Sequence, residues 1–335
     1  MIAHALQRLV RRIDSAVARL YLAASPERPG LLTFLFHSLF RDPAQIAFNL
    51  IDPLDRTTVD HLRRLIEYYQ AHGYRFIGLP ELQAGLPADG RYALLTFDDG
   101  YFNNTAALPL LERYRVPAVF FISTDNVRHN KCFWWDVLYR ELCGRGVPPT
   151  AIHAEALSLK SRTTEEIESA LAERFGHFAF TPRCDIDRPF SPHELRAFAA
   201  HPFVHIGNHT ANHAILTNYA PPLVREQISK AQQFLFETTG SEPAAIAYPN
   251  GAYSPQVLAT AAQLNLAIGF TTEPAKTRLP VPSDPPNRLR LGRFVPHAET
   301  PLLEQCRTYR SDLLAYSTLR RHFLRLVRRP GSPTA

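Results

Sequence analysis

Short apolar runs alternate with stretches of helical periodicity along most of this 335-residue chain. The periodic stretches, of which 57–72 and 223–239 are the clearest, repeat apolar residues every three or four positions and predict amphipathic helices. Runs rich in apolar and β-favouring residues predict strands at 31–38, 74–79, 92–97, 118–123, 203–207, 245–248, 267–271 and 289–295. A strand–helix–strand order favours parallel strands joined by right-handed crossovers, so the pattern predicts an α/β fold.

Three segments depart from this alternation. Residues 125–187 contain both tryptophans, a predicted helix at 163–175 and little strand character, so we interpret them as a mainly helical insertion that shapes or covers a site. Both ends of the chain show helical periodicity with arginines, at 1–24 and at 302–327. The expected organisation is therefore a basic amphipathic helix (1–24), a main domain (31–300) and a basic C-terminal helix and tail (301–335).

Charge and cysteine content bear on location. The net charge is +6, and the arginines that gather at the two ends leave contact with anionic lipid open beside simple packing on the protein body. Few aromatic residues accompany these arginines, which disfavours a nucleic-acid partner. The four cysteines form no CxxC pair, and residues 1–24 lack the apolar core of a signal peptide. We therefore expect a cytoplasmic protein, with peripheral contact at the inner membrane left open.

Two polar clusters stand at the ends of predicted strands. Asp98 and Asp99 end the strand at 92–97, and two adjacent buried carboxylates imply a cation or a shared proton, unless they only form an acidic turn. His209 and His213 follow a later strand and are four residues apart, so a helical turn would bring both imidazoles to one face. In a parallel barrel the strand ends share one rim, where an Asp–His–His set can bind a divalent ion.

Three segments resemble known motifs. Thr96-Phe-Asp-Asp-Gly100 and His209-Thr-Ala-Asn-His213 resemble the first two motifs of polysaccharide deacetylases with a NodB-homology domain, carbohydrate esterase family four. Ala247-Tyr-Pro-Asn-Gly251 stands where the third motif belongs, and the resemblance spans 31–295 apart from the insertion. It implies an irregular (β/α)7-type barrel of about seven strands, with 31–300 as the catalytic domain, and a hydrolase that acts on carbon–nitrogen bonds other than peptide bonds.

The resemblance also implies roles for individual residues. Asp99, His209 and His213 would bind one divalent ion, zinc or a similar metal, which would polarise the amide carbonyl and activate a water. Asp98 would act as the general base, and a backbone N–H near Asn250 would stabilise the oxyanion. The products would be acetate, or another small acid, and a free amino sugar.

Two family features are missing from their usual places. The third motif usually begins with an arginine that orients the catalytic aspartate, but this chain has Ala247 there and Asn250 in place of the usual tyrosine. Arg293, in the last predicted strand, is the expected substitute, with Arg290 as the next candidate.

The late Leu-His-Asp motif, which carries the general acid, is absent. His37 ends the first predicted strand and is expected to take this role, with His297 as a weaker rival.

The substrate expected from these features is an N-acylated amino sugar, in a polysaccharide, a lipid-linked saccharide or another glycan precursor. Expected substrate contacts are Tyr101, Trp134, Trp135 and Tyr248, although the tryptophans fit buried packing equally well. The leading hypothesis is removal of the acyl group, expected to be acetyl. The alternatives are an esterase or another amidase at the same site, or a catalytically impaired glycan-binding or scaffold protein with the same fold.

Overall fold

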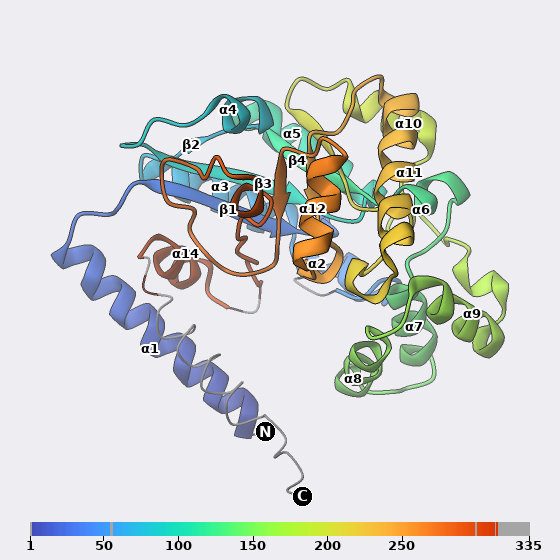
Figure 1. Ribbon diagram of the computed structural model, residues 1–335. Coiled ribbons are helices and arrows are strands. Elements are labelled where there is room, and N and C mark those ends of the chain that lie inside the picture. Colours follow the sequence, from blue (N-terminus) through green and yellow to red (C-terminus); the bar gives the residue numbers. More distant parts are fainter. Residues whose placement is uncertain (1, 54–55, 299, 312, 314–335) are drawn as a thin grey trace, which may run out of the picture.

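A parallel sheet forms the centre of the molecule (Figure 1). The computed structural model describes residues 2–53, 56–298, 300–311 and 313, with the backbone alone for 2–12. Its strands are β1 (Gly30–Phe36), β2 (Arg75–Phe76), β3 (Arg91–Phe97), β4 (Ala118–Ile122), β5 (Val204–Asn208), β6 (Ala245–Ala247) and β7 (Ile268–Phe270). They are ordered β1-β3-β4-β5-β6-β7. The short strand β2 pairs with the first half of β3, and β4 pairs with the second half. The predicted α/β fold is confirmed.

The segment 289–295 links the two edges of this sheet. Leu291 forms a parallel bridge with Phe270 of β7, and Phe294 forms one with Phe34 of β1. The backbone N–H of Phe294 donates to the carbonyl of Thr33 at 2.8 Å. The predicted last strand is therefore present as two isolated bridges, and it curls the sheet into an irregular barrel.

Helices cover the outside of the sheet (Figure 1). Before the insertion they are α1 (Ile2–Ala24), α2 (Pro43–Ile46), α3 (Val59–Ala71), α4 (Leu79–Ala84), η1 (Phe102–Ala107) and α5 (Leu108–Tyr114). After it they are α10 (Pro192–Ala199), η3 (Leu216–Asn218), α11 (Pro221–Thr239), η4 (Pro249–Gly251), α12 (Pro255–Gln263), α13 (Pro285–Arg288) and α14 (Leu302–Arg310). The 3-10 segment η1 runs directly into α5, which has Pro109 in its first turn.

Aromatic rings fill the core beneath the carboxyl ends of the strands. Phe36 of β1, Phe97 of β3 and Phe120 of β4 share one register, so their side chains lie on the same face. Their rings stack in sequence, with centroids 5.1 Å and then 4.8 Å apart, and all three are fully buried. This packing gives a rigid base to the loop that follows β3.

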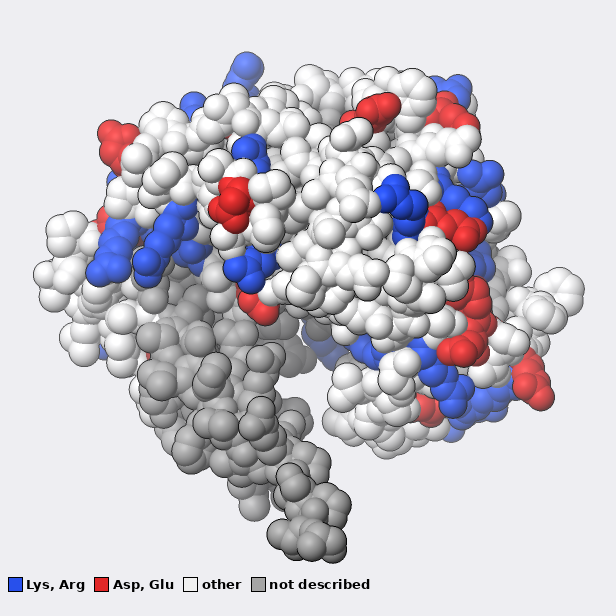
Figure 2. All heavy atoms as spheres, in the orientation of Figure 1, with Lys and Arg blue, Asp and Glu red and all other residues white. Residues whose placement is uncertain are grey.

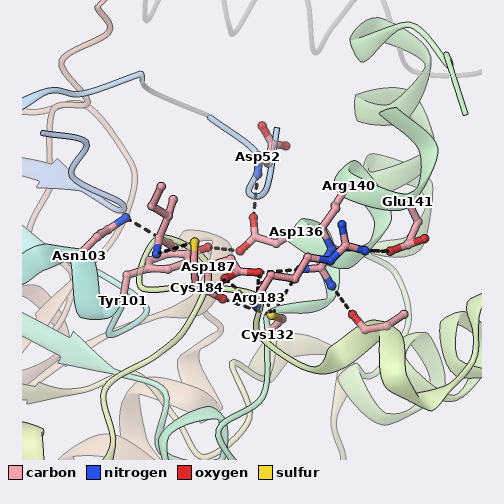
Figure 3. A network of polar contacts seen from close by, with 12 residues as sticks. Asp52, Tyr101, Asn103, Cys132, Asp136, Arg140, Glu141, Arg183, Cys184 and Asp187 are labelled. Atoms are coloured by element: carbon pink, nitrogen blue, oxygen red, sulfur yellow. Dashed lines mark hydrogen bonds and ion pairs between the residues drawn. The ribbon is translucent and has the colours of Figure 1, made fainter. Parts of the chain in front are cut away.

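The insertion forms a helical lobe at one side of the barrel (Figure 1). It contains α6 (Thr124–His129), α7 (Trp134–Cys143), α8 (Pro149–Leu159), α9 (Thr164–Phe175) and η2 (His177–Phe180), around an apolar core of its own. A buried network connects the lobe to the barrel (Figure 3). In it Arg140 binds Asp187 at 2.7 Å, and Tyr101 donates to Asp136 at 2.7 Å.

The N-terminal helix α1 packs against α14. Ala18 of α1 is buried, whereas Ile13, Val17 and Leu20 are between 44% and 67% exposed. The predicted C-terminal helix is described only as far as Arg310, and its continuation to residue 327 lies outside the described residues apart from 311 and 313. Within the described part of the chain, no helix is both long and apolar enough to cross a membrane.

Charged side chains of both signs are mixed on the face seen in Figure 2, most clearly along its right-hand edge.

Candidate active site

The polar residues selected from the sequence meet at the carboxyl ends of four strands. His37 follows β1, Asp98 and Asp99 follow β3, and His209 follows β5. Asn250 lies just beyond β6. Because the strands are parallel, these separate segments converge on one rim of the barrel.

Asp99, His209 and His213 form a compact group whose ligand atoms all lie within 4.8 Å of one another. Asp99 Oδ1 is 3.4 Å from Nε2 of each histidine. Both carboxylate oxygens of Asp99 are buried without a hydrogen-bond partner. A buried carboxylate that faces two imidazole nitrogens and lacks donors of its own fits a divalent cation, so this group could hold a metal ion.

A backbone carbonyl orients one of these imidazoles. Nδ1 of His209 lies 2.8 Å from the carbonyl oxygen of Ala247. A carbonyl only accepts, so Nδ1 carries the proton and Nε2 presents its lone pair to Asp99. Ala247 stands at the position where the arginine was expected, and its backbone supports a ligand instead.

The two histidines do not lie on a helical turn, so the expected reason for their proximity was wrong. Residues 209–213 form an irregular loop, in which Thr210 and His213 have φ angles of 66° and 55°. The Asn208 side chain accepts from the N–H of Thr210, and the Thr210 hydroxyl accepts from the N–H of Ala214, both at 2.8 Å. Side-chain hydrogen bonds therefore hold a left-handed turn that brings the imidazoles together.

Asp98 is held by Arg293. The guanidinium donates to Oδ1 and Oδ2 of Asp98, each at 2.7 Å, while its Nε donates to the carbonyl of Thr271. The Arg293 side chain is fully buried. Burial by itself raises the pKa of Asp98, but the positive charge of Arg293 and its hydrogen bonds outweigh this effect and lower the pKa below its usual value. Asp98 is therefore an ionised, fixed carboxylate next to the candidate metal group.

A cavity of about 440 Å³ opens over this group. The barrel contributes Asp99 and His213 to its lining, and the insertion contributes Trp134 and Trp135. The ring of Trp135 packs 4.4 Å from that of His213. His37 and Asn250 also line the cavity, so each has access to a bound molecule. The insertion thus forms one wall of the candidate site.

Four residues proposed from the sequence lie elsewhere. Tyr101 and Tyr248 were expected to contact substrate, but both side chains are buried outside the cavity lining. Arg290 binds only Asn287 among the contacts described for its side chain, and His297 lies beside α14. Tyr101 instead supports the cavity wall, because its hydroxyl accepts from Trp135 Nε1 at 3.0 Å.

Three polar residues of the cavity lining were missed in the sequence. Lys160, His153 and Asp52 line the cavity, and none of them belongs to a recognisable motif. His153 and Lys160 lie on or next to a helix of the insertion, whose position over the barrel has no sequence signature.

Burial dominates the electrostatics of two cavity residues. It lowers the pKa of His213 well below the usual histidine value, which favours the neutral form that binds metals. Burial also lowers the pKa of Lys160, and the carboxylates of Asp52 and Asp99 oppose this effect.

Three solved structures share this architecture, and two of them are described as deacetylases. The Streptococcus pyogenes deacetylase PplD, in complex with acetate, is 18% identical, with a TM-score of 0.56 over 84% of this chain and 99% of that one. IcaB from Ammonifex degensii is 17% identical, with a TM-score of 0.54 over 85% and 98% of the two chains. The BpsB deacetylase domain from Bordetella bronchiseptica is 18% identical, with a TM-score of 0.52 over 81% and 97%. At these identities the likeness establishes the fold alone.

Sequence comparison identifies the family. A search among curated proteins gave no match. The family model described as polysaccharide deacetylase matches residues 86–269, which is more than half of the chain and includes both the Asp98–Asp99 pair and the His209–His213 pair. The chain therefore belongs to the polysaccharide deacetylase family and is a hydrolase of carbon–nitrogen bonds other than peptide bonds.

Proposed function

We propose that this protein is a metal-dependent deacetylase that removes the acetyl group from an N-acetylated amino sugar of a glycan or glycan precursor. The observation that carries the proposal is the buried Asp99 carboxylate, which has no hydrogen-bond donor, faces two imidazoles and lies next to the clamped Asp98. Membership of the polysaccharide deacetylase family supports the reaction class.

Asp99, His209 and His213 would hold the ion, and Asp99 and His213 also line the cavity. A divalent ion in this place supplies Lewis acidity, which polarises an acyl carbonyl and makes a water a better nucleophile at neutral pH. The low pKa of His213 keeps its imidazole neutral, as metal binding requires.

Asp98 is the proposed general base. Each carboxylate oxygen accepts one N–H from Arg293, and each keeps a second lone pair that can accept a hydrogen bond from a water. Arg293 thus orients Asp98 and keeps it ionised, so that it can take the proton of the attacking water.

His37 is the proposed general acid for the departing amine. Two observations support this role: His37 lines the same cavity as Asp99, and its charge is among the influences on the pKa of Asp98. The backbone at Asn250 is the proposed partner for the oxyanion, because Asn250 lines the cavity beyond β6.

The first prediction separates metal binding from catalysis. Elemental analysis of the purified protein should find about one divalent ion per chain. The substitution Asp99→Ala should abolish both this ion and acetate release from N-acetylated sugars, because it removes the carboxylate ligand. Asp98→Asn should retain the ion and lower kcat at least about 100-fold, because only the base is lost.

Other outcomes favour the alternative functions. Metal binding without acetate release from any acylated sugar would favour a glycan-binding protein. A clear preference for O-acetyl esters over N-acetyl amides would favour an esterase. If Asp98→Asn kept full activity, Asp98 would not be the base.

We also propose a cytoplasmic location, which the four unpaired cysteines support. The partly exposed Ile13, Val17 and Leu20 of α1 are the candidate surface for peripheral membrane contact. Fractionation of cells into soluble, membrane and exported material tests both points, and recovery in the exported fraction would contradict the location.

A further inference from the structure

Residues 153–160, in and just after helix α8 of the insertion, form one wall of the candidate active site, and a polar contact joins each end of this wall to the barrel. We propose that these two contacts close the cavity, so that it accepts one terminal acylated sugar ring, either free or at the end of a chain. An internal unit of a polymer would then be excluded. This inference rests on the proposed deacetylase function and specifies its substrate class.

The first contact joins α8 to the loop between α2 and α3. His153 Nε2 lies 3.2 Å and 3.1 Å from the two carboxylate oxygens of Asp52. The Asp52 side chain is only 6% exposed, and its backbone N–H donates to Asp136 Oδ1 at 2.8 Å (Figure 3). Because Asp136 belongs to α7, two bonds connect the insertion to this loop.

The second contact joins the end of α8 to the loop that follows β6. Lys160, the C-cap residue of α8, donates from Nζ to Asn250 Oδ1 at 2.8 Å. The backbone is held as well, because the Asn218 side chain donates to the carbonyls of Lys160 and Arg162 at 2.9 Å and 2.8 Å. This end of the wall is therefore fixed to two loops of the barrel rim.

These two contacts stand at opposite ends of the wall. His153 and Lys160 are seven residues apart, which corresponds to about 10 Å along a helix. A polymer bound parallel to α8 would have to pass through the His153–Asp52 contact or the Lys160–Asn250 contact. A polymer bound across α8 would collide with the helix. Entry remains beside the 70% exposed Leu157 at the cavity mouth.

The size and lining of the cavity agree with a single ring. Its volume of about 440 Å³ lies in the range of small-molecule sites, roughly 300–1,000 Å³. Trp135 is fixed by its hydrogen bond to Tyr101 and by packing against His213, so it forms a rigid aromatic surface beside the candidate metal group. Such a surface suits the apolar face of one sugar ring.

A binding experiment tests the inference without catalysis. Both tryptophans of the chain line the cavity, so intrinsic fluorescence reports on its occupation. The zinc-loaded Asp98→Asn variant is titrated with N-acetylglucosamine and with its β-linked oligomers of two to six units. We expect the Kd to stop improving after the first one or two rings. A Kd that falls steadily up to six units would reveal an extended groove and overturn the proposal.

The position of deacetylation supplies the second test. Wild-type protein is incubated with N-acetylglucosamine and with its hexamer, and the products are sequenced by mass spectrometry. We expect acetate from the single sugar and, in the hexamer, from a terminal unit only. The ratio of the rates on these two substrates shows whether the protein prefers a free sugar or the end of a chain. Internal deacetylation at a comparable rate would overturn the inference but support the proposed function. No acetate from either substrate would overturn both.

The third test opens the cavity. The double variant Lys160→Ala/His153→Ala removes both contacts and should raise the share of internally deacetylated hexamer at least about threefold. The control is Lys131→Ala, which breaks the 2.7 Å pair with Glu168 inside the insertion and should leave the positions unchanged. If the double variant is folded by circular dichroism yet remains strictly terminal, these contacts do not close the cavity.

Discussion

At the scale of single residues, the site depends on a partner that is distant in sequence. Arg293 lies 195 positions from Asp98, yet its guanidinium donates a hydrogen bond to each oxygen of that carboxylate. It is also held by Thr271 and Thr96, so its geometry is fixed before any substrate arrives. A planar guanidinium has two parallel donors for a carboxylate, which the single ammonium of lysine lacks.

Replacing this arginine should therefore impair catalysis. Arg293→Lys is expected to lower kcat by about 10- to 100-fold, because Asp98 loses its orientation, while the metal content stays the same. Steady-state acetate release and elemental analysis measure the two effects. Arg290→Lys is the matched control, because Arg290 binds only Asn287 among its described contacts and should keep full activity. Equal effects of the two substitutions would contradict the role of Arg293.

At the scale of elements, the N-terminus of helix α10 is fixed by side-chain hydrogen bonds. Helix α10 precedes β5, the strand that carries His209, and it begins with a capping box. Ser191 accepts from the N–H of Glu194, and the Glu194 carboxylate accepts from the N–H of Ser191 at 2.9 Å. Arg188 adds two charged hydrogen bonds to the same carboxylate, at 2.7 Å and 2.9 Å.

This capping box predicts a pH dependence of stability. Hydrogen bonds from Arg188 are the main reason that the pKa of Glu194 falls from 4.5 to about 2. Because the folded-state pKa is depressed, the contribution is complete above pH 4.5 and is lost as the pH falls toward 2. Glu194→Gln should therefore lower the free energy of unfolding at pH 7 by at most about 1 kcal/mol, since the pair is partly solvated.

Urea unfolding of the wild type and of Glu194→Gln at several pH values measures this effect. The difference between the two proteins should shrink between pH 4.5 and pH 2. A difference that is constant over this range would show that the charge of Glu194 does not contribute.

At the scale of the whole molecule, the insertion serves as an active-site wall only if it is rigid. Its buried ion pair joins Arg140 of α7 to Asp187, and the side chains are 3% and 0% exposed (Figure 3). Asp187 also accepts from the N–H groups of Arg183 and Cys184. The pair therefore ties helix α7 of the lobe to the segment that returns to the barrel.

Removing one partner should be costly. Asp187→Asn removes the 2.7 Å charged partner of a buried guanidinium and leaves it only the longer 3.6 Å contact with Glu141. It is expected to lower the free energy of unfolding by about 3 kcal/mol. Asp185→Asn is the control, because Asp185 is 73% exposed and should change stability by about 0.5 kcal/mol or less. Denaturant unfolding compares the two. The double variant Arg140→Met/Asp187→Leu should be more stable than Asp187→Asn, and the opposite order would contradict this account.

The sequence by itself determined the alternation of strands and helices, and with it the α/β barrel. Parallel strands buried on both faces require nearly continuous apolar runs, and such a requirement is local. β1 and β3 are buried along nearly their whole length, as those runs predict. The Asp98–Asp99 and His209–His213 pairs were equally visible, because each stands directly at or beyond the end of a strand.

Only the tertiary structure decided which distant residues complete the site. The choice of Arg293 over Arg290 depends on which side chain turns into the barrel where the sheet closes, and neighbouring residues do not determine this. The approach of His209 and His213 depends on a left-handed loop held by side chains of Asn208 and Thr210 rather than on helical spacing.

The residues of the cavity wall could not be predicted from the sequence either. Tyr101 became a buried support, and Lys160 and His153 entered the cavity, because a separate helical lobe packs over the rim of the barrel. Packing between two apolar surfaces is non-directional and leaves no motif in either segment. The chemical groups of the site could therefore be predicted from the sequence, whereas the shape of the cavity around them depends on the tertiary structure.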